Sequence, residues 1–338
     1  MERRINYIDM AKGYGILAVL IGHLVQSSVL GTFVYSFHLP LFFFISGFLF
    51  RPEASFGSFL KHKAKSILLP YFVLGLPVVF FAAYFPLLFS GRWFSLRTFS
   101  YALWDNFLAF LIQNRYATLW YLAVLFFCNL VMFFIVAIKS RPAQLVTVLL
   151  LFCAAMAYYA FGGGPLPWDV DAVCPAVLFF WLGYRFRQQD RFTVEELSKE
   201  KTVKLLFLAL FLNILFNVLS LILTGEGLEM YWCSYGFVPF VVLSAVCGIF
   251  FVFFLSHVTE WTAISYIGKN SMLYFLWHQA IIYPVLDAVY TMLGVNDYYA
   301  SPVHFVLIVT TKVLFTCGAM FLLNELLKKT PLRVLLAK

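Results

Sequence analysis

Charged residues are scarce in this chain. Only 12% of its 338 residues are Asp, Glu, Lys or Arg, against about 25% in soluble globular proteins. So little charge cannot cover the surface of a water-soluble domain, and the scarcity of charge also excludes a disordered chain. Hydrophobic residues make up 63% of the sequence, and its mean hydropathy is +0.88. The composition therefore predicts a polytopic integral membrane protein, built as an all-α bundle of membrane helices.

Cysteine is also scarce, and its spacing carries no motif. The six cysteines form no CxxC pair and show no Cys/His spacing typical of a zinc site. Most of them lie inside apolar runs, where cysteine usually serves as a small hydrophobic residue. We therefore predict neither a disulfide framework nor a metal site.

The N-terminal segment lacks the features of a cleaved signal peptide. Arg3 and Arg4 would suit such a peptide, but the apolar stretch that follows contains Asp9 and Lys12. No small-residue cleavage site precedes Ser27. The segment is therefore interpreted as a retained first membrane span.

Long apolar runs are what the chain does have. A membrane helix needs about 20 mostly apolar residues, and about ten segments qualify. No internal repeat or low-complexity linker divides them, so we predict a single domain over 1–338. The segments are 8–29, 33–50, 66–89, 117–138, 143–161, 172–186, 204–224, 236–256, 271–293 and 303–325.

The basic residues predict which way the chain crosses the membrane. With ten spans and a cytoplasmic N-terminus, 19 of the 24 Lys and Arg residues fall on the cytoplasmic side. Only Arg92, Arg97 and Arg115 fall outside, while Lys12 and Lys312 lie within spans. Since cytoplasmic loops are enriched in Lys and Arg, both termini are predicted to be cytoplasmic. The net charge of +8 then needs no nucleic-acid partner.

A polar stripe marks the first span. Lys12 and His23 are 11 residues apart, which puts them on one helix face about 16 Å apart along the axis. Asp9, Gln26 and Ser27 extend that face. Polar groups inside a membrane indicate function, and an imidazole at this depth could take a proton or an acyl group. The alternative is that Lys12 extends to the interface and His23 is a packing residue.

The second span begins with another histidine. His38 has a depth comparable with that of His23, although an interfacial residue at a helix start is an equal alternative. Further along the same helix, Ser46 and Gly47 form a small patch that favours close helix packing.

Further polar residues lie in the later spans. An unpaired Lys312 would be costly, so we expect it to contact Asp287 or another acceptor, either as a bundle-stabilising ion pair or for function. His278 lies in the middle of the ninth span. Asn213 and Asn217 share a face of the seventh span and favour hydrogen bonds between helices.

The first fifty residues resemble the acyltransferase-3 family of membrane O-acyltransferases. The family's hallmark is a basic residue, ten residues and a His on the first helix, followed by an FHxPLFFFxSG second helix. This chain has Lys12 and His23, and then FHLPLFFFISG at 37–47. Weaker similarities are KHKAK at 61–65 before a Pro-Tyr pair, LWYL at 119–122, FFWLGY at 179–184 and SMLYFLWH at 271–278.

Lys12 departs from the family's usual pattern. Most members carry Arg at this position, and Lys offers a point charge instead of a bidentate contact. The segment YIDMAKG at 7–13 is similar to the sequences of the fucose-4-O-acetylase-like branch, where Lys is usual at this position.

The resemblance implies an enzyme of a bacterial-type inner membrane. It would move an acetyl or other acyl group from cytoplasmic acyl-CoA to a hydroxyl of a cell-surface glycan or its lipid-linked precursor. Acyl-CoA would be a co-substrate, with no bound cofactor, and membrane lipid would surround the bundle. His23 and His38 are the catalytic candidates, with His23 as general base or acyl carrier. The substrate-binding candidates are Asp9, Lys12, Gln26, Ser46, Lys61, Lys63, Lys65, Trp120, Tyr121, His278 and Lys312.

Two other classes suit parts of the pattern. A proton-coupled membrane transporter could use Asp287 and Lys312 as a relay, although the chain shows no inverted repeat. A sensory receptor without chemistry would not need a polar stripe that leads from the cytoplasm toward the exterior.

Overall fold

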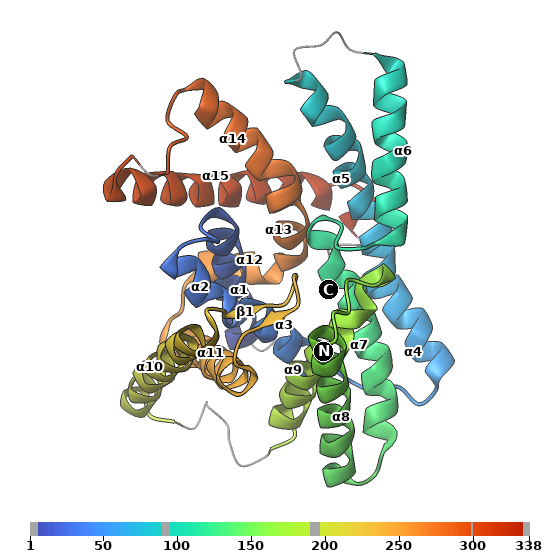
Figure 1. Ribbon diagram of the computed structural model, residues 1–338, viewed down its shortest axis with the longest axis vertical. Helices are drawn as coiled ribbons and strands as arrows, with labels where there is room; N and C mark the ends of the chain where they lie inside the picture. The colour runs from blue at the N-terminus through green and yellow to red at the C-terminus, as the bar shows by residue number, and fades with distance from the viewer. Residues whose placement is uncertain (1–5, 90–94, 190–196, 299, 334–338) are drawn as a thin grey trace. The chain divides into compact units, whose positions relative to one another are not determined.

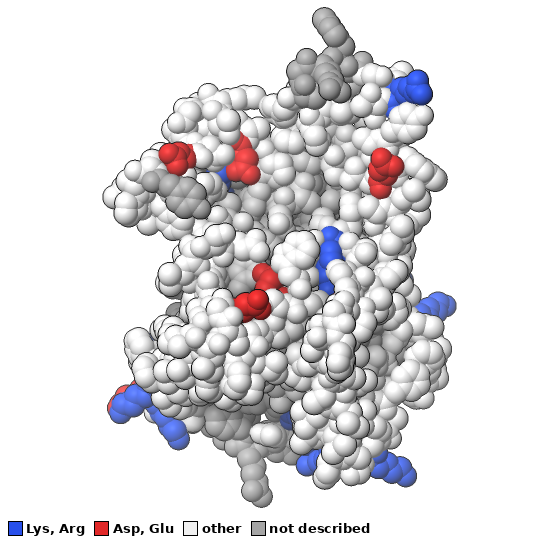
Figure 2. All heavy atoms as spheres, in the orientation of Figure 1, with Lys and Arg blue, Asp and Glu red and all other residues white. Residues whose placement is uncertain are grey.

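The structure is a computed structural model that describes residues 6–89, 95–189, 197–298 and 300–333. Apart from one hairpin of two-residue strands, its regular elements are helices (Figure 1). Figure 2 shows charged side chains as isolated patches on a surface made mostly of other residues. The predicted all-α membrane protein is thereby confirmed.

Eight helical segments in the described residues are long and apolar enough to cross a membrane. The helices at 6–24 and 173–187 are not among them, so the count of ten spans and the cytoplasmic location of both termini stay predictions. The eight segments are Val29–Phe48, Phe56–Leu88, Leu96–Ala137, Arg141–Ala160, Lys199–Thr224, Val238–Val258, Ser271–Met292 and Pro302–Lys328.

The chain forms two compact units, each assembled from three separate stretches. The first unit comprises Met1–Pro52, Val131–Gly162 and Cys174–Ser271, and the second comprises Glu53–Leu130, Gly163–Val173 and Met272–Lys338. The single domain over 1–338 stays a prediction.

The first unit contains helices that cross at glycines. α1 packs on α12 and α11, and α10 lies beside α11 (Figure 1). At Gly268 an added Cβ would lie 1.8 Å from the Asp9 carbonyl oxygen, and at Gly47 it would lie 1.8 Å from that of Phe180. The predicted close packing at Ser46 and Gly47 is therefore confirmed. The elements are α1 (Asn6–Leu24), α2 (Val29–Tyr35), α3 (His38–Phe48), α8 (Arg141–Ala160), α9 (Val173–Arg187), α10 (Lys199–Thr224), β1 (Leu228–Glu229), β2 (Ser234–Tyr235), α11 (Val238–Val258) and α12 (Thr262–Lys269).

The prediction of one helix over 8–29 was wrong at its end. α1 stops at Leu24, and a turn leads into α2. Ser28 stabilises this turn because its Oγ donates to the Val25 carbonyl at 2.7 Å and accepts from the Gly31 N–H at 3.0 Å. Gln26 and Ser27 therefore lie in a turn and do not extend the helical stripe.

The predicted helix over 33–50 is also divided. α2 ends at Tyr35 and α3 begins at His38. Pro40 lies near the start of α3 and has no N–H to bond to the carbonyl four residues earlier, so one continuous helix would lose a hydrogen bond there. The break places Tyr35 and His38 on either side of a bend.

The second unit contains two π-helical turns, each followed by a proline. η1 precedes Pro70 and η5 precedes Pro284, each at the second position of the next helix. A helical break lies at Asn270, between the end of α12 at Lys269 and the start of α13 at Ser271. The elements are α4 (Phe56–Lys63), η1 (Ala64–Leu68), α5 (Leu69–Leu88), α6 (Leu96–Ile112), η2 (Ala117–Leu119), α7 (Trp120–Ala137), η3 (Pro167–Ala172), α13 (Ser271–Trp277), η5 (His278–Ile282), α14 (Tyr283–Met292) and α15 (Pro302–Lys328).

The helix α6 was not predicted. It packs beside α5 (Figure 1), where the sequence analysis placed an outer loop. Arg97, Asp105 and Asn106 interrupt its apolar residues, which kept this segment out of the predicted spans.

Candidate active site

His23 contacts a tyrosine that the sequence analysis did not single out. It lies in the last turn of α1, where its Nδ1 is 3.3 Å from the Tyr35 hydroxyl. The two rings meet edge to face with centroids 6.1 Å apart. Tyr35 is buried, so the hydroxyl holds the imidazole at a site that is largely removed from water.

His38 contacts the ring of the same tyrosine. Its ring centroid is 4.7 Å from that of Tyr35, in an edge-to-face arrangement. Its Nδ1 donates to the Val34 carbonyl at 2.9 Å, because a carbonyl can only accept. This bond leaves Nε2 as the nitrogen without a proton in the neutral ring. The structure therefore brings both predicted histidines to one aromatic side chain.

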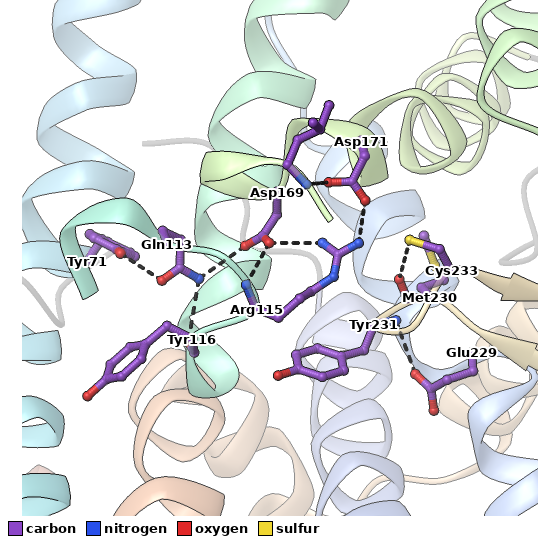
Figure 3. A network of polar contacts seen from close by, with 11 residues as sticks. Tyr71, Gln113, Arg115, Tyr116, Asp169, Asp171, Glu229, Met230, Tyr231 and Cys233 are labelled. Atoms are coloured by element: carbon purple, nitrogen blue, oxygen red, sulfur yellow. Dashed lines mark hydrogen bonds and ion pairs between the residues drawn. The ribbon is translucent and has the colours of Figure 1, made fainter. Parts of the chain in front are cut away.

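A carboxylate from a distant segment completes this cluster. Glu229 lies on β1, which packs against α2. Its Oε1 accepts from the Tyr231 N–H at 3.1 Å (Figure 3), and it also accepts a hydrogen bond from the side chain of Gln26. Burial raises the pKa of Glu229 to about 7. Glu229 therefore titrates near neutral pH.

Two asparagines of α10 hold the bend between α2 and α3. The Asn213 Nδ2 donates to the Ser36 Oγ at 2.9 Å and to the Ser244 carbonyl at 2.8 Å. The Asn217 Nδ2 donates to the Thr32 carbonyl at 3.2 Å. The predicted hydrogen bonds between helices are confirmed, and they fix the backbone on both sides of Tyr35.

The remaining first-unit candidates lie away from Tyr35 along the chain. Asp9 is buried and Lys12 is partly buried on α1, and Ser46 is partly buried on α3. Their predicted role in substrate binding stays a prediction. Gln26, by contrast, joins the Tyr35 cluster through Glu229.

A separate ion-pair network lies in the second unit. Arg115 binds Asp169 at 3.0 Å and Asp171 at 2.5 Å, with all three side chains buried (Figure 3). The Gln113 Nε2 donates to Asp169 at 3.2 Å, and the Tyr71 hydroxyl donates to the Gln113 Oε1 at 2.9 Å. Desolvation raises the pKa of Asp169, although Arg115 opposes the shift.

The backbone around this network is strained. Five non-glycine residues there have left-handed φ angles, which such residues adopt rarely. The buried ion pairs and the strain occur together. We therefore interpret the network as a structural one that holds the loops at 113–117 and 168–171 in one conformation. The five residues are Gln113, Arg115, Ala117, Trp168 and Asp169.

Lys312 pairs with Asp287, as predicted. The ammonium is fully buried on α15 and binds the Asp287 carboxylate, the Asn296 Oδ1 at 2.8 Å and the Tyr298 hydroxyl at 3.0 Å. It also lies 4.9 Å from the centroid of the Tyr290 ring. These contacts compensate for burying the charge, and the proposed role of Lys312 in substrate binding stays a prediction.

Three other second-unit candidates are Trp120, Tyr121 and His278, and the last two lie close to the ring of Phe275. Tyr121 is buried with its ring 4.8 Å from that of Phe275, which is 6.4 Å from the ring of His278. The His278 Nδ1 donates to the Tyr274 carbonyl at 2.8 Å. The neighbouring Trp120 is also buried, with the Arg115 guanidinium 5.6 Å from its ring.

The predicted donor-binding lysines lie on one short segment of the second unit. Lys61 and Lys65 are exposed, and Lys63 is partly buried with its ammonium 5.4 Å from the Phe59 ring. The described part of the chain holds no group of three His, Cys, Asp or Glu residues arranged to bind a metal.

Together, the fold and the two-histidine cluster define a multi-pass membrane protein with groups suited to proton transfer at a buried site. The chain belongs to the acyltransferase 3 family, because that family's model, described as an acyltransferase domain, matches residues 5–324. It is therefore an O-acyltransferase, which confirms the enzyme interpretation over the transporter and receptor alternatives. Comparisons with curated proteins and with solved structures gave no match.

Proposed function

We propose that this enzyme transfers an acetyl or other short acyl group from cytoplasmic acyl-CoA to a hydroxyl of a cell-surface glycan or its lipid-linked precursor. Its place would be a bacterial-type inner membrane. The observation that carries the proposal is the contact of the His23 Nδ1 with the Tyr35 hydroxyl, beside His38. A tyrosine that holds one ring nitrogen orients the other for proton transfer.

His23 acts as the general base in this proposal. Its Nε2 removes the proton of the acceptor hydroxyl while the acceptor oxygen bonds to the acyl carbonyl carbon. The carbon–sulfur bond of the thioester then breaks, and the imidazolium gives the proton to the departing thiolate. The His23 ring is therefore regenerated in each turnover, and the products are an ester and free CoA.

The basic segment at 61–65 supports an acyl-CoA donor. CoA carries several phosphate charges, and exposed lysines contribute attraction to such a ligand. Lys61 and Lys65 are exposed on α4 and η1. The excess of basic residues on the predicted cytoplasmic side agrees with a donor that comes from the cytoplasm.

Sealed vesicles of known orientation test the proposal. Acetyl-CoA labelled in its acetyl group is supplied on one side only, with a glycan acceptor on the other. We expect covalent label on the acceptor only when the donor faces the basic segment. Label that remains in acetyl-CoA under every condition would contradict this donor, while transfer to water or to protein alone would contradict the glycan acceptor.

The donor site has its own test. Replacing Lys61, Lys63 and Lys65 by Gln together should raise KM for acyl-CoA more than it lowers kcat, because these charges bind ground and transition states alike. High salt should weaken donor binding in the wild type more than in the triple variant. Replacement of Lys199, Lys201 and Lys204 by Gln is the matched control. An unchanged KM in the triple variant would indicate that these lysines only orient the chain in the membrane and do not bind the donor.

A further inference from the structure

Glu229 is held at the histidine cluster by groups from two segments. Its carboxylate accepts from the Tyr231 N–H on its own hairpin and from the Gln26 side chain in the turn after α1. The segment that leads into β1 lies against α2, since a methyl group added at Gly227 would be 3.6 Å from the Thr32 Cγ2. A flexible surface carboxylate would have no such fixed position.

Glu229 also acts electrostatically on Tyr35. The two groups are close enough for the carboxylate charge to affect the phenol, and the phenol hydroxyl contacts the His23 Nδ1. The carboxylate, the phenol and the imidazole are contributed by β1, α2 and α1, and β1 packs against α2. In the same loop, the carboxylate of Glu226 is exposed and instead accepts from the Ser234 Oγ at 2.6 Å.

We propose that Glu229 is a positioning residue that acts through Tyr35 to stabilise the His23 imidazolium formed during acyl transfer. The inference rests on the proposed function. Glu229 itself neither gains nor loses a proton in the step, because the proton moves from the acceptor hydroxyl to the His23 Nε2 and on to the thiolate. The negative charge lowers the energy of the positive ring, and partial burial strengthens that attraction.

Catalysis benefits because the attraction appears only when the ring is charged. An interaction that is stronger in the transition state than in the ground state raises kcat and leaves KM nearly unchanged. A carboxylate beside a catalytic histidine acts in this way in serine hydrolases. In this chain the carboxylate acts on a tyrosine whose hydroxyl contacts the imidazole.

The test compares Glu229→Gln with wild type across pH. The titratable group on which the carboxylate acts is Tyr35, whose hydroxyl contacts His23 and whose ring contacts His38. Tyr231 meets the carboxylate through its backbone N–H. Because Glu229 has a pKa of about 7, the wild type loses this charge as the pH falls. The variant should therefore show a kcat about 10- to 100-fold below wild type at about pH 8, and this gap should narrow by roughly fivefold to eightfold at about pH 6, where about a tenth of the carboxylates are still charged.

Three variants make the result specific. Glu229→Asp should recover part of the loss, Glu226→Gln should behave as wild type, and Glu229→Gln should have no further effect in a His23→Ala background. A kcat ratio that stays constant across pH, or a loss confined to KM, would overturn the role of Glu229. An active His23→Ala enzyme would instead overturn the proposed function, so the two failures are distinguishable.

A groove on the first unit carries an independent inference. Its volume is about 790 Å³, and its walls come from α3, α8, α9 and α11. Phe44, Trp181 and Phe250 contribute to a mainly apolar lining, while Arg141 and Arg185 also line it. Both arginines lie near helix ends, Arg141 at the start of α8 and Arg185 in the last turn of α9.

The geometry points to an anionic phospholipid as the occupant of this groove. Its phosphate would lie at the two guanidinium groups, and its acyl chains would cover the apolar walls that α11 continues into the membrane. Arginine suits phosphate because its donors match the oxygens in pairs. Basic pockets between membrane helices bind anionic headgroups on the same principle.

Native mass spectrometry of the purified protein with phosphatidylglycerol or phosphatidylcholine tests this site. We expect preferential retention of phosphatidylglycerol, and a loss of about tenfold or more in Arg141→Gln/Arg185→Gln. Lys139→Gln is the matched control, because Lys139 is exposed two residues before Arg141 and does not line the groove. Equal retention of both lipids, or an equal loss in the control, would overturn the inference.

Discussion

At the residue scale, the site depends on Tyr35, which contacts both catalytic candidates. It holds the His23 Nδ1 through its hydroxyl and packs its ring edge to face with His38. His38 is further fixed by its bond to the Val34 carbonyl. In the proposed reaction these side chains would start already oriented, and little ordering would remain when substrate binds.

Replacing Tyr35 with Phe should lower kcat while the protein stays folded. The change removes one hydroxyl, so the loss should correspond to one hydrogen bond of about 1 kcal/mol, or roughly fivefold to tenfold in rate. Steady-state kinetics with labelled acyl-CoA measures the effect. Tyr101→Phe, in exposed α6, is the control. A Tyr35→Phe enzyme with wild-type kcat would show that the hydroxyl does not orient His23.

Lys312 supplies a prediction about stability. Asp287→Asn would leave the fully buried ammonium without its carboxylate, whereas Asp287→Asn/Lys312→Met removes both charges. The single change should destabilise the protein by about 3 kcal/mol, at the low end for a broken buried pair because Asp287 is half exposed. The double change should recover most of that loss. Thermal unfolding in detergent compares them, and equal melting temperatures for single and double variants would contradict the assignment.

At the element scale, two features determine where the site residues lie. They are the bend between α2 and α3 and the close helix crossings at glycines. The bend places Tyr35 and His38 on opposite sides of Ser36, and α10 holds it through Asn213 and Asn217. Gly47 and Gly183 let α3 and α9 approach to backbone contact. Close approach of this kind is how membrane helices pack without a hydrophobic driving force between them.

The crossing of α3 and α9 can be tested by adding one methyl group. An Ala at Gly47 would place Cβ 1.8 Å from the Phe180 carbonyl oxygen, so the helices must separate. We expect Gly47→Ala to destabilise the protein by about 1–3 kcal/mol, read as a lower temperature of half-unfolding. Gly318→Ala on α15 is the matched control, since nothing lies within 4 Å of its added methyl. An equal, small effect in both variants would contradict the crossing.

At the scale of the whole molecule, composition and motif spacing predicted the membrane-helix fold, the family and the Lys312–Asp287 pair, while the catalytic roles of His23 and His38 stay predictions. These features follow from apolar length and from the cost of buried charge, which act locally along the chain. The ends of the helices predicted at 8–29 and 33–50 were less accurate. The turn at Ser28 and the break before Pro40 each depend on single hydrogen bonds, which an apolar pattern does not reveal. Tyr35 and Glu229 were missed because the electrostatic interaction between them links residues 194 positions apart in the numbering.

The account's central claim is that His23 transfers the proton of the acceptor hydroxyl. The most direct measurement is single-turnover transfer of labelled acetyl from acetyl-CoA to the acceptor by purified wild-type, His23→Ala and His304→Ala enzymes. A general base contributes about 10²- to 10⁴-fold, so His23→Ala should lose at least the lower figure while His304→Ala keeps the wild-type rate. With acceptor omitted, no label should remain on the wild-type protein. A His23→Ala enzyme that transfers label at the wild-type rate would contradict the claim, as would an acetyl group found on His23 itself.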